Sequence, residues 1–338
     1  MGKLKIAVVG TGFIGALHAR IIYECPKAEL AAVADINGES AATVGAAYGC
    51  HSYTDLEQLL NMEETDAVDI CTPEEYHLEA VRLAAAYGKH ILLEKPAART
   101  YQEALEIDRL AKTHDVRLMV AHLLHFDPRY ATLEEAVQRG ELGEVVSMFF
   151  RRVNWKRTTR RLKGKVSFLY YMCVHDIEFM LSCNRGTKPV KVYAQGVSKI
   201  NAEVNQEDTA FLTVNFENGS LACIQVLWAM PENTAAILQT GAEVLGTAGM
   251  GYVDGRMQGV EIVTEQAVFH PDVLHWPEYN GRMQGDLKEE IHHFVDATLH
   301  EYPYLMDTGR AMVAVRIIEA ALLSMKTGMP VTLSEQEV

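Results

Sequence analysis

A glycine-rich loop near the start of the chain constrains the fold more than any other feature of the sequence. The apolar run Ile6–Val9 leads into the sequence GTGFIG, and a helical pattern then continues through Ile22. Strand, Gly-x-Gly-x-x-Gly and helix in this order are typical of a dinucleotide-binding βαβ unit. The glycines allow a tight turn, approach to a pyrophosphate, and close helix–strand packing. We expect the whole loop to contact a cofactor: Gly10, Thr11, Gly12, Phe13, Ile14 and Gly15.

An acidic residue ends the second expected strand. Asp35 follows the apolar run Leu30–Ala34 and lies 20 residues after Gly15, where the fingerprint places the acid that binds a ribose diol. A carboxylate there repels a 2′-phosphate, and the following Ile36 and Asn37 offer no cation to bind one. We therefore predict NAD as the cofactor, with NADP less favoured. The alternative is an α/β turn of the same shape that binds no nucleotide.

Strands and helices alternate regularly up to about His122. Further strands are expected at 67–71, 90–93 and 117–121, and helices at 39–48, 55–61, 75–86 and 101–112. Such alternation predicts an α/β Rossmann domain with a doubly wound parallel sheet. Ligands of these sheets lie at the carboxyl ends of the strands.

The stretch Ile91–Pro96 joins a buried strand to polar residues. Glu94 and Lys95 follow the apolar run, and Pro96 cannot extend a ladder of hydrogen bonds. A lysine beside an apolar strand end can be desolvated, which moves its pKa toward a range useful for proton transfer. Read alone, the stretch also fits a surface Glu–Lys pair. Thr72-Pro73 likewise follows a strand, so both segments are expected at the cofactor edge of the sheet.

The pattern of predicted helices and strands changes after His122. We expect helices at 128–140 and 168–183, a strand at 145–152, a polar loop at 154–166, and six to eight strands between Pro189 and Phe269. Two helices, at about 285–300 and 308–327, follow. This pattern predicts an α+β domain with a largely antiparallel sheet. The predicted domains are 1–122, which binds the dinucleotide, and 123–338, whose C-terminal helices pack back toward the first domain.

Composition excludes several classes of function. The 338 residues carry a formal net charge of −14, which disfavours nucleic acid or an anionic membrane as a partner. Six scattered cysteines without a Cys-x-x-Cys pair indicate free thiols in a reducing compartment. No histidine falls into metal-ligand spacing with a cysteine, so we expect no metal. No charge-free run is long and apolar enough for a bilayer, and we expect a soluble, cytoplasmic protein.

Taken together, these motifs resemble the glucose–fructose oxidoreductase / inositol dehydrogenase (Gfo/Idh/MocA) family over nearly the whole chain. The resemblance rests on the glycine loop, Thr72-Pro73 with His77, Glu94-Lys95-Pro96, Gly140-x-Leu142-Gly143, His175 and the C-terminal pattern from Asp307 to Val331. It implies a Rossmann domain and a second domain with an open sheet. Family members usually form dimers or tetramers through that sheet, so we expect self-association.

The resemblance also implies an activity. The family transfers a hydride between a nicotinamide and a secondary hydroxyl of a sugar, an inositol or a related polyol. By resemblance, Lys95 binds the nicotinamide ribose and the reacting hydroxyl, and His175 is the general acid/base. Thr72, Pro73, His77 and Glu94 are expected around the cofactor, Asp176 near the substrate, and the Lys95–Pro96 peptide bond in the cis form. An imidazole has a suitable ordinary pKa for the alcohol proton at neutral pH.

Three positions depart from the family pattern. Tyr171 stands one helical turn before His175, where members often carry Asp. Its phenol either contacts the substrate hydroxyl as a third catalytic group or packs beside Tyr170. Glu74 replaces the usual Asn after Thr72-Pro73, and His125 replaces the usual Arg before Phe126. We keep His125 as a candidate substrate contact.

A basic segment stands out in this acidic chain. Residues 156–165, directly after Trp155, contain six cations, including Arg157 and Arg161. In the family this region borders the substrate pocket, so Trp155, Arg157 and Arg161 are candidate substrate-binding residues. Arginine forks would hold an anionic substrate, such as a uronate, a sugar phosphate or a nucleotide sugar. The alternatives are a solvated loop, or a loop paired with acidic groups of a neighbouring subunit.

The sequence therefore predicts an NAD-dependent oxidoreductase of a small-molecule sugar or polyol. A non-catalytic NAD(P)-binding sensor or regulator with the same fold is the alternative. That alternative requires loss of the proton-transfer pair, yet Lys95 and His175 are both present.

Overall fold

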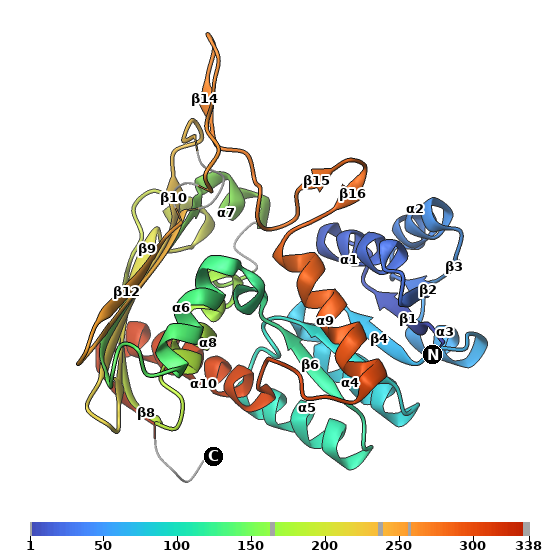
Figure 1. The fold of residues 1–338 in the computed structure, drawn as a ribbon, viewed down its shortest axis with the longest axis horizontal. Coiled ribbons are helices and arrows are strands. Elements are labelled where there is room, and N and C mark those ends of the chain that lie inside the picture. The colour runs from blue at the N-terminus through green and yellow to red at the C-terminus, as the bar shows by residue number, and fades with distance from the viewer. Residues whose placement is uncertain (1, 163–165, 236–238, 256–257, 334–338) are drawn as a thin grey trace. The chain divides into compact units, whose positions relative to one another are not determined.

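The computed structural model describes residues 2–162, 166–235, 239–255 and 258–333 (Figure 1). The chain forms two compact units. The first comprises Met1–Phe126 and His275–Val315, and the second comprises Asp127–Leu274 and Arg316–Val338. Among the described residues, no helix has the length and apolar character needed to cross a membrane.

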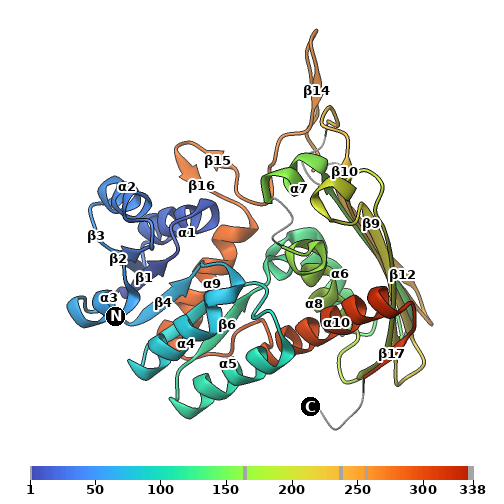
Figure 2. The ribbon, with the colours of Figure 1, turned by 180° about the vertical axis from the view of Figure 1, so that it is seen from behind.

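The first unit is built on a six-stranded sheet with the order β3-β2-β1-β4-β5-β6. All neighbouring strands are parallel, which confirms the predicted doubly wound sheet. Its central strands are buried because helices cover both faces (Figures 1 and 2). The strands are β1 (Leu4–Val9), β2 (Ala28–Ala34), β3 (His51–Tyr53), β4 (Ala67–Ile70), β5 (His90–Glu94) and β6 (Leu118–Ala121).

Side-chain caps fix where several helices of this unit begin. Asn37 caps α2, Asp55 caps α3 and Thr100 caps α5, each accepting from backbone N–H groups of the first turn. Two neighbouring pairs, α1 with α9 and α4 with α5, pack side by side. The helices are α1 (Phe13–Glu24), α2 (Gly38–Tyr48), α3 (Leu56–Met62), α4 (His77–Ala86), α5 (Tyr101–Thr113) and α9 (Asp286–His300), with short 3-10 turns η1 (Glu74–Tyr76) and η2 (Leu123–Phe126). A hairpin of β15 (Glu278–Tyr279) and β16 (Arg282–Met283) precedes α9.

The second unit is built on a seven-stranded mixed sheet with the order β12-β11-β7-β10-β9-β8-β17. Only β7 and β10 run parallel among its neighbouring strands in the described part of the chain. The strands are β7 (Val145–Trp155), β8 (Pro189–Val197), β9 (Thr209–Phe216), β10 (Leu221–Met230), β11 (Gln239–Gly246), β12 (Met250–Asp254) and β17 (Val331–Thr332). This confirms an α+β second domain with a largely antiparallel sheet.

Alternation along these strands separates a covered face from an open one. Buried and accessible residues alternate along β10, and α8 (Val174–Cys183) packs against β7 and β10. The opposite face exposes large apolar side chains, including Phe149, Phe211 and Tyr252. The remaining elements are α6 (Pro128–Gln138), α7 (Lys156–Leu162), the π-helical turn η3 (Leu169–Cys173), η4 (Ala202–Val204), the hairpin β13 (Ile262–Val263) with β14 (Val268–Phe269), and α10 (Thr308–Thr327), which begins in the first unit.

The prediction of a polar loop at 154–166 is wrong for most of that segment. Strand β7 continues to Trp155, and residues Lys156–Leu162 form helix α7. Lysine, arginine and leucine are good helix formers, so a run of cations does not by itself indicate a loop. Lys163, Gly164 and Lys165, the last part of the basic segment, lie outside the described residues. Strand β3 was also missed, because three residues are too few to show alternation.

Candidate active site

The glycine loop has the geometry that its sequence predicts. Gly10 has φ +89°, and a Cβ there would lie 2.7 Å from the carbonyl group of Cys71. A Cβ at Gly15 would lie 1.8 Å from the oxygen of Gly10. By contrast, a Cβ at Gly12 would meet nothing within 4 Å. Gly10 and Gly15 thus serve the packing of loop, strand and helix, and Gly12 leaves open space beside the backbone.

The residues present fit a dinucleotide. Helix α1 begins after Gly12 with no side-chain cap and no acidic residue in its first turn. Its first N–H groups therefore remain available for an anion, and the helix dipole favours negative charge there. A pyrophosphate would lie on Gly12 and this first turn. Phe13 is largely exposed and Ile14 partly buried at the same place.

Asp35 is tied to the glycine loop. Its Oδ2 accepts from the backbone N–H of Thr11 at 2.7 Å and from the Thr11 hydroxyl at 3.1 Å. Its Oδ1 accepts from the N–H of Asn37 at 2.8 Å. The carboxylate is only partly buried, and Oδ1, which accepts one hydrogen bond, keeps a second lone pair. Asp35 can therefore accept from a ribose hydroxyl while it holds the loop.

His77 joins the loops that follow β4 and β5. Its Nε2 lies 2.9 Å from the carbonyl oxygen of Thr72, and its Nδ1 lies 3.3 Å from that of Ala97. Burial lowers the pKa of His77, although these carbonyl groups favour its charged form. Its ring therefore lies within the protein and links Thr72-Pro73 to the segment after Pro96. The Lys95–Pro96 peptide bond is cis, as the resemblance implied.

Glu94 turns its carboxylate back into the unit. Only 8% of the residue is exposed. Its Oε2 accepts from the backbone N–H of Lys95 at 3.0 Å, and its Oε1 lies 3.4 Å from Nε2 of His18. Burial opposes ionisation, yet His18 and Lys95 lower the pKa of Glu94 below its ordinary value. Lys95 itself is partly buried. The sequence reasoning missed His18, whose only signal was its place in the helix after the glycine loop.

Four strand ends of the first unit thus present the predicted cofactor residues at one edge of its sheet. These are the ends of β1, β2, β4 and β5, which are parallel and adjacent. The residues that follow them are Gly10–Gly15, Asp35, Thr72-Pro73 and Lys95-Pro96.

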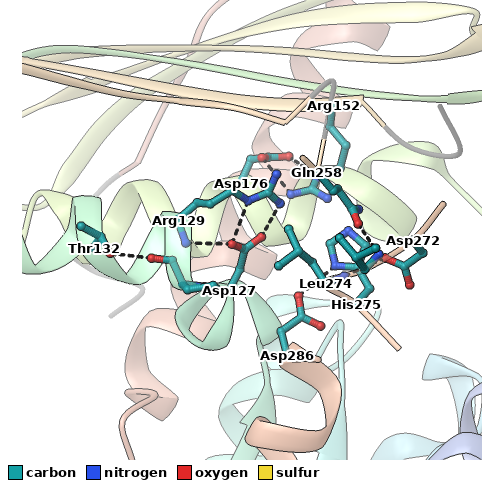
Figure 3. A network of polar contacts seen from close by, with 12 residues as sticks. Asp127, Arg129, Thr132, Arg152, Asp176, Gln258, Asp272, Leu274, His275 and Asp286 are labelled. Carbon is teal, nitrogen blue, oxygen red and sulfur yellow. Dashed lines mark hydrogen bonds and ion pairs between the residues drawn. The ribbon is translucent and has the colours of Figure 1, made fainter. Parts of the chain in front are cut away.

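In the second unit, His175 lies at the start of α8, directly after the π-helical turn η3. Only 9% of it is exposed. Such π-turns are frequent at functional sites. The next residue, Asp176, is fully buried and accepts from Nε and Nη2 of Arg152 at 2.6 and 3.1 Å. Figure 3 shows this forked pair, and a similar pair between Arg129 and Asp127 at the start of α6. The Asp176 carboxylate thus has a structural partner, and its predicted contact with substrate stays a prediction.

The basic helix α7 lies beside Tyr171. Nη2 of Arg161 donates to the Tyr171 hydroxyl at 3.2 Å. The guanidinium of Arg157 lies 3.5 Å above the ring of Trp155 and 3.7 Å from Glu232. The predicted residues Trp155, Arg157, Arg161 and Tyr171 therefore form two contacting pairs of residues, one through a ring face and one through a hydroxyl group. The ring of Tyr171 also lies 6.2 Å from that of Trp228, and its predicted contact with the substrate hydroxyl stays a prediction.

The other two departures lie in short turns of the first unit. His125 belongs to η2 and is buried. Glu74 opens η1 directly after Pro73.

Comparisons with known proteins agree with this architecture. Residues 4–122 match the model described as "Oxidoreductase family, NAD-binding Rossmann fold", and residues 130–251 match the GFO/IDH/MocA C-terminal domain. The uncharacterized oxidoreductase YrbE of Bacillus subtilis is 30% identical over 99% of this chain and 98% of its own length.

Two further relatives show how the family varies. The 2,7-anhydro-N-acetylneuraminate hydratase of Mediterraneibacter gnavus is 28% identical over 76% of this chain and 71% of its own. The scyllo-inositol dehydrogenase of Lactobacillus casei, solved with NAD(H) and scyllo-inositol, superposes with a TM-score of 0.86 over 98% of this chain and 99% of that one, at 18% identity. It supports the fold. With a family model on each unit and a full-length relative, this chain belongs to the Gfo/Idh/MocA family of NAD-binding oxidoreductases.

Proposed function

We propose that the protein is an NAD-dependent dehydrogenase of a cyclic polyol or sugar derivative. The observation that carries the proposal is the set of adjacent strand ends in the first unit, where the open Gly12 backbone, Asp35 and Lys95 lie at one sheet edge. A family of NAD-binding oxidoreductases that includes dehydrogenases of inositols supports it. NAD is preferred to NADP, because the Asp35 carboxylate disfavours a 2′-phosphate.

Each proposed residue has one role. Bound NAD⁺ supplies the hydride acceptor for the C–H bond of the alcohol. Lys95 donates hydrogen bonds to the reacting hydroxyl and to the ribose of the nicotinamide, and its charge stabilises the developing alkoxide. His175 accepts the hydroxyl proton as the general base and returns it in the reverse reaction. Tyr171, which accepts from Arg161, is proposed as a third catalytic group that handles this proton.

The substrate class is proposed to be anionic. Arg157 and Arg161 lie on one short helix and contact Trp155 and Tyr171. Guanidinium groups next to aromatic rings suit a sugar that carries a carboxylate or phosphate. One relative is named for 2,7-anhydro-N-acetylneuraminate, a sugar acid. His125 and Asp176 remain proposed substrate contacts, and self-association through the open sheet remains a proposal.

A substrate panel tests the function. Purified protein with NAD⁺ is given inositols, aldoses, uronates and sugar phosphates in turn, and NADH absorbance is followed. We expect turnover with at least one cyclic polyol or sugar acid, and a lower KM for the acidic members. NAD binding without turnover of any compound in either direction would favour the non-catalytic sensor instead.

A further inference from the structure

A buried cluster of ionisable groups lies behind the Glu94–Lys95 turn, and the proposed reaction does not use it directly. His18 projects from α1, Asp69 from β4, Glu94 from the end of β5 and Glu290 from α9. His18, Asp69 and Glu290 have no exposed surface. Burying a charge costs free energy unless the charge is paired. The distribution of protons among these four groups therefore determines whether the cluster is stable.

His18 is the centre of the cluster. Its Nδ1 lies 2.9 Å from Oδ2 of Asp69. Its Nε2 makes no hydrogen bond within the described residues, but it lies 3.4 Å from Oε1 of Glu94, at ion-pair distance. An imidazole can donate from both nitrogens only when it is protonated. Burial opposes that charge, yet Asp69 raises the pKa of His18 well above its ordinary value. Cys71, also buried, places its Sγ 3.4 Å from the other Asp69 oxygen.

Glu290 faces this ion-paired chain as a fourth member. Neither of its carboxyl oxygens has a hydrogen-bond partner among the described residues. Burial and then the charge of Glu94 raise the pKa of Glu290 well above its ordinary value. Asp69 and Asp286 add to that effect, and His18 opposes it. Because the carboxyl group is fully buried and has no hydrogen-bond partner among the described residues, these surroundings favour its neutral form.

These contacts link three elements that carry predicted cofactor residues. The His18 ring connects helix α1, which follows the glycine loop, to the strands that precede Thr72 and Lys95. Glu94 extends this chain of contacts to Lys95, because its other carboxylate oxygen accepts from the backbone N–H of Lys95. A change in the ring is therefore transmitted to the main chain of the proposed catalytic lysine.

We propose that His18 is a positioning residue that, as an imidazolium between Asp69 and Glu94, fixes the Lys95 turn, with Glu290 as the neutral acid that lets both carboxylates stay ionised beside it. Only the effect on turnover rests on the proposed function. The protonation pattern concerns the first unit alone and can be measured without a substrate.

Neutron diffraction from a crystal of the unsubstituted protein tests the pattern directly. We expect deuterons on both ring nitrogens of His18 and one on the carboxyl group of Glu290. A single ring deuteron, an ionised Glu290, or a metal ion between His18, Asp69 and Cys71 would overturn the proposal. The last outcome is a real competitor, since ligand atoms of these three residues lie within 4.8 Å of one another.

Two substitutions separate positioning from general stability. The amide nitrogen of His18→Gln can replace Nε2 toward Glu94, whereas that of His18→Asn can replace only Nδ1 toward Asp69. We expect His18→Asn to lower kcat by about 100-fold, because displacing a catalytic group by roughly 1 Å can reduce the rate by that factor. His18→Gln should retain at least about tenfold more activity than His18→Asn, and both should keep the NAD Kd and the substrate KM.

The exposed His114→Gln variant serves as the control for a histidine lost elsewhere in the same unit. Equal kcat losses in the two His18 variants, or a loss confined to NAD affinity, would refute the positioning role. Failure of every compound in the substrate panel would instead refute the proposed function, and it would leave the neutron result standing as the test of the network.

Discussion

Thr11 donates two hydrogen bonds to a single carboxylate oxygen of Asp35, one from its backbone N–H and one from its hydroxyl. The acid that is expected to select the cofactor therefore also holds the loop that is expected to bind the pyrophosphate. Ser40 reinforces the contact, since its hydroxyl donates to the Thr11 carbonyl oxygen at 3.0 Å. Cofactor affinity and cofactor choice should accordingly change together when Asp35 is altered.

Asp35→Ala should weaken the binding of NAD and reduce the preference of the protein for NAD over NADP. The substitution removes both the ribose acceptor and the charge that repels a 2′-phosphate, so we expect about a tenfold loss of NAD affinity, or about 1.4 kcal/mol. Asp35→Asn should keep an acceptor for Thr11 and lose mainly the charge. Titration with both cofactors measures this, and Glu57→Gln, an exposed acid of the same unit, is the charge-matched control. Equal affinities in the unsubstituted protein would contradict the role of Asp35.

Lys95→Ala should bind NAD but lose turnover. Without the ammonium, the reacting hydroxyl lacks a donor and the alkoxide lacks a positive charge, so kcat should fall by about 100- to 10,000-fold. Steady-state kinetics with the best substrate and a direct NAD titration distinguish the two effects. Lys112→Ala removes an exposed lysine that pairs with Asp108 in the same helix at 2.6 Å and should behave as wild type. Full activity of Lys95→Ala would exclude its catalytic role.

The cofactor half of the candidate site could be predicted from the sequence because it follows short-range rules. Glycine spacing fixes the loop, and the ends of parallel strands necessarily meet at one edge of the sheet. The positions of Gly10, Asp35, Thr72 and Lys95 at this edge could therefore be predicted without knowing any tertiary contact.

The buried cluster could not be predicted in this way. His18 is a single histidine in an amphipathic helix, which usually indicates a core position. Glu290 lies far away in the chain, and the packing of α9 against α1 and η2 brings it into the same unit's core. Helix α7 was missed for another reason, since a cationic run is compatible with both a loop and a helix.

Arg157→Ala and Arg161→Ala should each raise KM for an acidic substrate more than for a neutral one. Loss of a guanidinium that holds a carboxylate or phosphate should raise that KM by about tenfold. Arg160→Ala is the matched control, because Arg160 lies on the same helix and pairs with Glu203 at 3.5 Å. If neutral inositols are the best substrates and all three variants behave alike, the anionic substrate class is wrong.

Arg152→Met should destabilise the protein strongly. It leaves the fully buried Asp176 carboxylate without its forked partner, and breaking such a pair costs about 3–5 kcal/mol. The neighbouring Arg151→Met loses a contact with Gln225 on the partly accessible side of the strand and should change stability by about 0.5 kcal/mol or less. Urea unfolding at neutral pH measures both. Equal midpoints would show that the Arg152–Asp176 pair contributes little to the fold.

Glu290→Gln should make stability less dependent on pH. The folded-state pKa of Glu290 is raised above its unfolded value, so its contribution is complete below the ordinary pKa of glutamate and is lost as the pH rises toward the folded-state pKa. In that window the unfolded chain releases the proton and the folded protein retains it, which lowers the free energy of unfolding by about 1.4 kcal/mol per pH unit. Glutamine has no proton to release.

Unfolding midpoints of Glu290→Gln and the unsubstituted protein should therefore nearly coincide at a pH of about 4 and diverge toward a pH of about 7, with the variant the more stable of the two. Glu289→Gln, its exposed neighbour on α9, should follow the unsubstituted protein throughout. A variant that is less stable at neutral pH would mean that the Glu290 carboxylate is ionised and paired in the folded protein. In that case Glu290 would be a partner of the His18 imidazolium rather than the neutral acid beside it, and the charge of the buried cluster would have to be balanced by a bound cation instead.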